Sequence, residues 1–293
     1  MADGVISPEV GRSDAAIAPL SDVAFLTQID WQRPWLAAVL PAAQEVLKIL
    51  GETRSASAMR EALSAVAQRR ALCNRAGLPL EFVAQACLPE NCAYESFIFA
   101  QGQVPTRDNL HDFFNALVWL SMPQIKQELN RLQAAHILQH GVGQVRGALR
   151  DAATLFDENA ALLLLADDEQ GDALASALRA HEWGSFFAHL PHSARPYLFG
   201  HALMEKLVNP YKAITAHTWL LHVPRSLLDA PMLEQLAYCD TQIARQLQQA
   251  APSPVNFLPL PIAGIPGWWE GQDAQFYADV QVFRPPRKPK IRS

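Results

Sequence analysis

His111 and Asp112 stand side by side in residues 104–119, a stretch that is dense in polar side chains. If a helix begins at Asn109, His111 and Asn115 are four residues apart and share one of its faces. Asp112 then points about 100° away from His111 around the helix axis. An imidazole beside a carboxylate is an element of metal-binding and acid–base sites. We therefore predict a site around this helix. The residues predicted to contact its substrate are Arg107, Asn109, Asn115 and, further along the chain, Arg150.

A second pair, His201 and Glu205, has the spacing HxxxE, which again places both side chains on one helical face. At this spacing the two side chains can share a divalent metal ion, or the carboxylate can orient the imidazole as a general base. The pair lacks the second histidine of the HExxH pattern, so a zinc protease is not indicated. The alternative is a polar contact within a partly buried helix.

Charged residues also bracket a predicted hairpin, with Arg150 and Asp151 before it and Asp157 and Glu158 at its turn. If this hairpin shares a sheet with an earlier one, Asp157 approaches His111. The converging nitrogen and oxygen atoms suit Zn, Mn or Mg. The predicted catalytic residues are His111, Asp112, Asp157, His201 and Glu205, and the predicted metal ligands are His111, Asp112, His201 and Glu205.

Arginines near the same residues indicate an anionic substrate. Arg107, Arg146 and Arg150 can each bind a phosphate or carboxylate group through two parallel N–H bonds. The sequence has no Walker loop and no GxGxxG or GxSxG motif, which argues against the corresponding nucleotide-binding and acyl-transfer sites. The leading hypothesis is a metal-assisted hydrolase that acts on a phosphate-containing substrate.

A non-enzymatic protein is the competing hypothesis. In that case the same histidines, carboxylates and arginines bond backbone groups or one another and hold the elements together. The chain would be a binding or assembly protein, and its basic, proline-rich tail, residues 284–293, would contact an anionic partner. The two hypotheses differ in whether His111 lines a cavity that is open to solvent.

The pattern of apolar residues predicts the elements that position these side chains. Helices are predicted in residues 31–50 (with a start at Pro41), 55–73, 109–119, 125–140, 167–181, 198–208 and 231–249. Two hairpins, residues 80–85 with 94–100 and 152–157 with 160–166, and a strand over 215–223 supply the sheet. Residues 258–269 contain too many Pro and Gly residues for regular structure.

The fold class that follows is α+β: a small antiparallel sheet built of hairpins, packed with helices, and an α-rich N-terminal part. We predict a flexible lead-in over residues 1–28, one domain over 29–283 (helical over 29–76, mixed over 77–283) and the basic tail over 284–293.

Composition and the absence of targeting signals indicate the class of protein and its expected location. Of the 293 residues, 50% are hydrophobic and 18% charged, which is typical of a globular protein. A net charge of −5 argues against a protein that coats nucleic acid. The four cysteines form no CxxC pair and are expected to be reduced thiols. We find no signal peptide and no apolar run of about 20 residues, so a cytoplasmic location is expected.

Several blocks of sequence are similar to an uncharacterised bacterial family known as a domain of unknown function. The blocks are Val104-Pro-Thr-Arg107, Asn109 with His111-Asp-x-Phe-Asn-Ala-Leu-Val-Trp119, Arg146-Gly-x-x-Arg150-Asp151, Thr154-Leu-Phe-Asp157-Glu158, Phe199-Gly-His-Ala-Leu-x-Glu205-Lys206 and Gly264-Ile-Pro-Gly-Trp268. They run from the first predicted hairpin almost to the C-terminus. The resemblance implies no activity, cofactor or catalytic residue.

Overall fold

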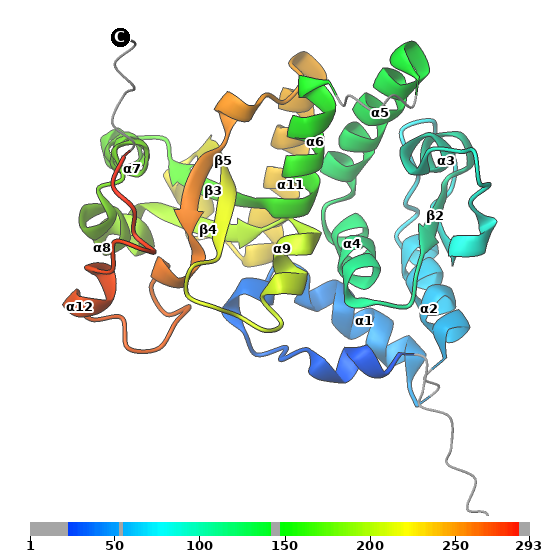
Figure 1. The fold of residues 1–293 in the computed structure, drawn as a ribbon, viewed down its shortest axis with the longest axis horizontal. Helices are drawn as coiled ribbons and strands as arrows, with labels where there is room; N and C mark the ends of the chain where they lie inside the picture. Colours follow the sequence, from blue (N-terminus) through cyan, green and yellow to red (C-terminus); the bar gives the residue numbers. More distant parts are fainter. Residues whose placement is uncertain (1–22, 53–54, 142–146, 287–293) are drawn as a thin grey trace, which may run out of the picture.

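Four strands form a mixed sheet in the order β4-β3-β5-β6 (Figure 1). The strands are β3 (Ala160–Ala166), β4 (Ala194–Leu198), β5 (Thr215–Val223) and β6 (Leu258–Pro261). β3 pairs with β4 antiparallel and with β5 in parallel, and β6 is antiparallel to β5. The computed structural model describes residues 23–52, 55–141 and 147–286.

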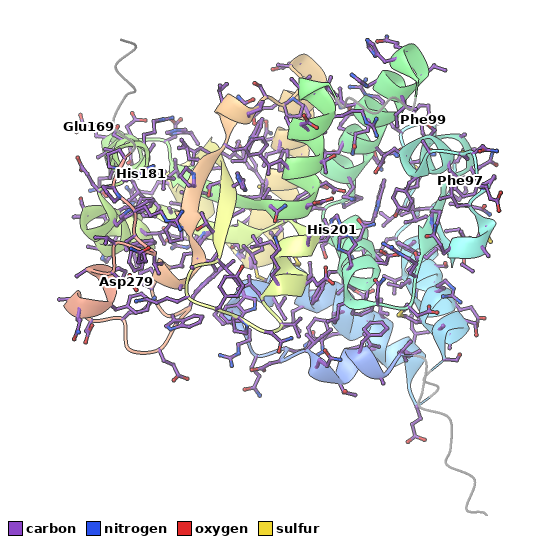
Figure 2. The ribbon with its side chains drawn as sticks, viewed as in Figure 1. Phe97, Phe99, Glu169, His181, His201 and Asp279 are labelled. Carbon is purple, nitrogen blue, oxygen red and sulfur yellow. The ribbon has the colours of Figure 1, made fainter. Side chains whose placement is uncertain are left out.

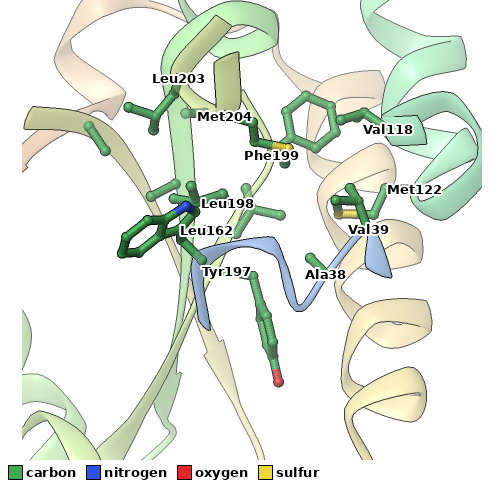
Figure 3. Close-up of a cluster of buried hydrophobic side chains, with 14 of the residues drawn as sticks. Ala38, Val39, Val118, Met122, Leu162, Tyr197, Leu198, Phe199, Leu203 and Met204 are labelled. Atoms are coloured by element: carbon green, nitrogen blue, oxygen red, sulfur yellow. The ribbon is translucent and has the colours of Figure 1, made fainter. Parts of the chain in front are cut away.

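β3 is an inner strand whose seven residues, Ala-Ala-Leu-Leu-Leu-Leu-Ala, are all buried. A continuous apolar run is expected of a strand that has neighbours on both edges and packed elements on both faces. Leu162 of β3 lies in one apolar cluster with Leu198 of β4 and with Val118 of α4 (Leu110–Ser121) (Figure 3). The sheet and helix α4 therefore share a core.

The other part of the molecule is built around a two-stranded parallel sheet. β1 (Glu81–Ala84) and β2 (Gln103–Thr106) pair in parallel, and α3 (Tyr94–Gln101) lies between them in the chain. β1 packs against α2 (Ala56–Arg69). Figure 1 shows α2, α3 and β2 together at the right of the view, with α4 between them and the larger sheet.

The remaining helices surround these two sheets. They are α1 (Leu40–Leu50), α5 (Pro123–His140), α6 (Ala148–Asn159), α7 (Glu169–Ala180), α8 (Trp183–Ser193), α9 (His201–Lys206), α10 (Arg225–Leu228), α11 (Met232–Gln249) and α12 (Ala274–Tyr277). Over the described ranges, no helix has the length and apolar character needed to cross a membrane.

One hydrophobic cluster extends along the chain from Val23 to Phe283. Val23 and Leu26 are buried members of it, so the described end of the predicted lead-in, from Val23 onward, packs with the domain. Residues 1–22 lie outside the described residues, and so do residues 287–293 of the predicted basic tail.

The α+β class is confirmed, and most predicted elements occur. The predicted helices correspond to α1, α2, α4, α5, α7, α11 and the shorter α9, and three predicted strands correspond to β1, β3 and β5. The helix-rich N-terminal part consists of α1 and α2. The pairing of the strands differs from the prediction, because no two strands of the described part are joined by a tight hairpin turn.

The first predicted hairpin is wrong. Residues 80–85 contain β1, but residues 94–100 belong to helix α3, which buries Phe97 and Ile98. A short apolar run fits a strand and a buried helix equally well, so its pattern does not decide between them. β1 pairs instead with β2, and the connection between them is the helix.

The second predicted hairpin is also wrong in its first half. Residues 152–157 lie in α6, whose buried residues are Ala152, Ala153, Phe156 and Asp157, a spacing that follows a helical face. Residues 258–269 are not wholly irregular, because β6 occupies 258–261. The prolines of β6 are tolerated there because it is an edge strand.

Helix α9 approaches the junction of α6 and β3 closely at Gly200. A Cβ atom at this position would lie 2.5–2.6 Å from three backbone atoms of residues 158–160. The backbone N–H of Gly200 also donates to the carbonyl of Ala160 at 2.9 Å. Only glycine permits this approach, which brings His201 at the start of α9 towards Asp157 near the end of α6.

We expect Gly200→Ala to lower the free energy of unfolding by about 1–3 kcal/mol, because the added methyl group must displace backbone atoms. Denaturant unfolding measures this change. Gly184→Ala in α8 is the matched control, since a Cβ there meets nothing within 4 Å. The control should be neutral or stabilise by up to about 1 kcal/mol. Equal free energies of unfolding for the two variants would contradict the claim that only glycine fits at position 200.

Candidate functional site

A pocket of about 440 Å³ opens between helices α3, α4, α5, α6 and α9. Figure 2 shows His201 near the centre of the molecule, beside α4 and α9. The polar side chains that line the pocket are Gln85, Tyr94, Glu95, Arg107, His111, Asp112, Asn115, Gln133, Arg150, Thr154, Asp157, Glu158 and His201.

The start of α4 fixes the rim of this pocket. Asn109 is the N-cap, and its side-chain oxygen accepts from the backbone N–H of Asp112 at 2.8 Å. Asp112 accepts from Arg107 through both carboxylate oxygens, from Nε at 3.0 Å and Nη2 at 2.9 Å, and also from its backbone N–H. This bonding raises the pKa of the Arg107 guanidinium. Asp112 therefore holds Arg107 in place.

The imidazoles of His111 and His201 face each other where α4 meets α9. Their Nε2 atoms are 3.1 Å apart, and the two rings are nearly perpendicular. The second nitrogen of His111, Nδ1, lies 2.9 Å from Oε2 of Glu205. The second nitrogen of His201, Nδ1, lies 3.9 Å from Oδ2 of Asp157 and is buried with no hydrogen-bond partner in the described part of the chain.

Two neutral imidazoles can satisfy the two short contacts of this arrangement but not the contact between His201 and Asp157 as well. A carboxylate only accepts, so Nδ1 of His111 carries its hydrogen and Nε2 is bare. If Nε2 of His201 donates to it, Nδ1 of His201 is left bare towards the Asp157 carboxylate. If Nδ1 of His201 carries the hydrogen, two lone pairs meet at 3.1 Å. In either arrangement one ring nitrogen of His201 has no hydrogen-bond partner among the described residues.

Asp157 is kept ionised by Lys126 of α5. Lys126 is only 4% exposed and donates to one oxygen of Asp157 and, at 2.8 Å, to Oδ1 of Asn115. Its ammonium also lies 5.3 Å from the centre of the Trp119 ring. Burial opposes the ionisation of Asp157, but the ion pair with Lys126 outweighs it and holds the pKa below its ordinary value.

His201 is uncharged in this environment. Burial lowers its pKa to about 4, and the nearby negative charge of Asp157 opposes this shift only in part. The imidazole is therefore neutral at pH 7 and has a lone pair available on one nitrogen atom.

Asn115 connects Lys126 to Tyr94 of α3. Its Nδ2 donates to the hydroxyl oxygen of Tyr94 at 3.0 Å, while its Oδ1 accepts from Lys126. Burial raises the pKa of Tyr94 well above its usual value and also raises the pKa of the neighbouring Glu95. The phenol is therefore neutral at physiological pH.

Arg150 of α6 is a cation with an unused donor at the pocket. Its Nε is buried and has no hydrogen-bond partner among the described residues. A guanidinium with a free N–H is suited to an anionic ligand such as phosphate. Arg146, which was predicted beside it, lies outside the described residues.

The structure brings most of the predicted site residues to one pocket. Arg107, His111, Asp112, Asn115, Arg150, Asp157 and His201 line it. Glu205 contacts His111 from behind the lining, and Asn109 acts as a helix cap. The residues meet because three helices, α4, α6 and α9, converge. The shared sheet that was predicted to bring Asp157 to His111 does not exist, since Asp157 lies in α6.

Lys126 and Tyr94 are two site residues that the sequence did not reveal. A signal for Lys126 exists in hindsight: Lys126, Asn130 and Gln133 form a polar stripe at helical spacing, and all three are buried. Tyr94 was hidden by its incorrect assignment to a strand.

The predicted metal ligands do not all converge. Asp112 is bonded to Arg107, and Glu205 faces the nitrogen of His111 that points away from His201. In the part of the chain that the structure describes, no group of three or more His, Cys, Asp or Glu side chains has a metal-binding arrangement. Among the predicted ligands, the Nε2 atoms of His111 and His201 lie close together, 3.1 Å apart. The metal itself stays a prediction.

Comparison with known proteins gives a family. A family model described as "Protein of unknown function (DUF3025)" matches residues 80–287. The matched range contains every side chain that lines the pocket, while α1 and α2 precede it. No curated protein and no solved structure matches the chain.

We expect the metal-free protein to lose up to about 3 kcal/mol of stability between pH 6.5 and pH 4 through His201. The unfolded chain protonates this imidazole near pH 6.5 and the folded protein near pH 4. Over that interval the unfolded state binds more protons, so the contribution present above pH 6.5 is lost as the pH falls.

Urea unfolding of chelator-treated wild type and His201→Gln at several pH values measures this loss. The pH dependence should be weaker in His201→Gln, and His189→Gln, an exposed histidine of α8, should behave as wild type. If the free energy of unfolding changed with pH to the same extent in wild type and in His201→Gln, the neutral, buried state of His201 would be contradicted.

Proposed function

Because the chain belongs to the DUF3025 family, whose description gives no activity, we propose a function from the side chains of the pocket. The proposal is a metal-assisted hydrolase that acts on a phosphate-containing small molecule. The observation that carries it is the pair of imidazoles at the pocket wall, with Nε2 atoms 3.1 Å apart and a carboxylate near each of the other nitrogens.

The geometry of the imidazole pair is compatible with a shared divalent ion. Two nitrogen ligands of a tetrahedral Zn²⁺ lie about 3.3 Å apart, close to the observed separation of the Nε2 atoms. Glu205 and Asp157 face the far nitrogens, as carboxylates behind metal-binding histidines commonly do. Imidazole ligands favour Zn²⁺ among the predicted Zn, Mn and Mg. Water and substrate oxygen atoms would complete the coordination.

The phosphate group would bind to the arginines. Arg150 has a buried donor that no described residue uses, and Arg107 is held at the rim by Asp112. When bound, a divalent ion lowers the pKa of a water molecule and neutralises charge on the phosphate. Glu205 would keep the imidazole of His111 oriented, Asp157 would place a negative charge 3.9 Å from Nδ1 of His201, and Lys126 keeps Asp157 ionised. A cytoplasmic location, which the sequence leads us to expect, is part of this proposal.

The alternative is a non-enzymatic binding or assembly protein. Two observations favour it for individual residues: Asp112 is fully bonded to Arg107, and Asn115 is bonded to both Lys126 and Tyr94. The same view does not account for an open pocket lined by an imidazole pair and an arginine with an unused donor. The anionic partner assigned to the basic tail would then be the ligand of interest.

We expect the protein to hydrolyse p-nitrophenyl phosphate or bis(p-nitrophenyl) phosphate when supplied with Zn²⁺ or Mn²⁺, and His111→Ala to abolish this activity. Glu205→Gln should lower kcat/KM about 10- to 100-fold, because it removes the carboxylate behind His111. His189→Ala is the control and should retain activity. The His111 side chain is 30% exposed, so its loss should change the melting temperature little.

Elemental analysis of the same preparations separates the two hypotheses. The hydrolase predicts one metal equivalent in the wild type that is lost in both His111→Ala and His201→Ala. No hydrolysis and no metal after dialysis against Zn²⁺, Mn²⁺ and Mg²⁺ would rule it out. A large drop in melting temperature for His111→Ala would favour the structural role.

A further inference from the structure

Tyr94 lines the same pocket as the two imidazoles. We propose that its hydroxyl group donates a proton to the departing oxygen of the substrate, which makes Tyr94 a catalytic residue. The substrates would accordingly be phosphate esters of aliphatic alcohols, whose alkoxides leave poorly without a proton. This inference rests on the hydrolase proposed above and deepens it.

The position of Tyr94 relative to His111 is set by helix α4. The Tyr94 hydroxyl accepts from Nδ2 of Asn115 at 3.0 Å. Asn115 follows His111 by one helical turn on the same face, where neighbouring Cβ atoms are about 5–6 Å apart. Lys126 holds the Asn115 amide from the other side at 2.8 Å. Because Tyr94 and both imidazoles line one pocket, one ester can meet the imidazole pair with its phosphoryl group and Tyr94 with its ester oxygen.

The hydrogen of the Tyr94 hydroxyl is available to a ligand. A tyrosine hydroxyl has one hydrogen to donate and lone pairs with which to accept. The ammonium of Lys126 only donates, so it must face Oδ1 of Asn115, and the amide nitrogen therefore faces Tyr94. This bond uses a lone pair of the hydroxyl. No residue of the described ranges accepts a hydrogen bond from Tyr94.

The surroundings of Tyr94 keep this hydrogen in place at neutral pH. Burial raises the pKa of the phenol, and the neighbouring carboxylates of Glu95, Asp112 and Asp157 raise it further. An alkoxide is a stronger base than a phenolate and takes the proton. The p-nitrophenolate ion is a much weaker base and departs without it, so a proton donor matters little for that leaving group.

The step conserves atoms and charge. The oxygen of a water molecule forms a bond to phosphorus, and the bond between phosphorus and the ester oxygen breaks. The electron pair of the broken bond stays on the ester oxygen, which takes the proton of Tyr94 and leaves as an alcohol. The attacking water releases a proton to solvent, and the phenolate of Tyr94 regains one from solvent. The products are an alcohol and inorganic phosphate.

Tyr94→Phe tests this role, because it removes the hydroxyl and keeps the ring. We expect kcat to fall about 10²- to 10³-fold for n-butyl phosphate and less than about threefold for p-nitrophenyl phosphate. A residue with only a structural role would lower both rates equally. Calorimetric binding of inorganic phosphate should be unchanged in the variant, since the phenol contacts only the leaving group.

Tyr197→Phe is the matched control. Tyr197 of β4 is buried, donates to Gln235 at 2.6 Å and does not line the pocket. Figure 3 shows its hydroxyl pointing away from the surrounding apolar cluster. Like Tyr94→Phe, this change leaves a side-chain amide without its partner, but it should alter neither rate.

The outcomes separate the two proposals. If the wild type hydrolyses both esters and Tyr94→Phe slows them equally or not at all, Tyr94 is not the proton donor although the hydrolase stands. If the wild type hydrolyses neither ester with Zn²⁺ or Mn²⁺, the hydrolase and the role of Tyr94 are both overturned.

Discussion

The candidate site depends on a buried ion pair, Lys126 with Asp157. Removing a lysine ammonium from water costs several kcal/mol, so a carboxylate must accompany it into the interior. Lys126 of α5 is 4% exposed, and Asp157 of α6 is its partner. Asn115 of α4 supplies a second acceptor. One ammonium group therefore fixes three helices relative to one another, and these helices form much of the pocket wall.

The charge of Asp157 also acts on the imidazoles. Because Lys126 occupies one of its oxygens, the other is left towards Nδ1 of His201, where it favours a hydrogen on that nitrogen. Glu205 has the same effect on Nδ1 of His111. Both contacts direct the Nε2 lone pairs towards each other. The close approach of α9 at Gly200 makes this geometry possible.

Helices and strands could be predicted where the apolar residues of the segment itself follow a clear helical or strand pattern. β3 is a continuous apolar run, β5 is rich in β-branched, aromatic and aliphatic residues, and the amphipathic helices α2 and α11 have caps or breaks at their ends. The strand pairing could not be predicted in the same way. Residues 94–100 and 152–157 have compositions that suit either element, and the neighbours of β3 are decided by packing between distant parts of the chain.

Helical spacing singled out His111, His201 and Glu205, while Asp157 and Arg150 were singled out as charged residues that bracket a predicted hairpin. Their meeting across 90 residues of chain depends on helix packing, which no local pattern encodes. Lys126 escaped detection because a lysine in an amphipathic helix is ordinarily a solvated residue. Its burial becomes intelligible only when Asp157 is placed beside it.

The most direct test of the proposal that His111 and His201 share one metal ion through their Nε2 atoms is a long-range ¹H–¹⁵N spectrum of the histidine rings. The spectrum should be recorded on chelator-treated protein while Zn²⁺ is added. We predict that the Nε2 signals of both residues shift together and saturate at one equivalent, while exposed histidines such as His189 do not change. A shift of only one ring, or of neither, would contradict the account.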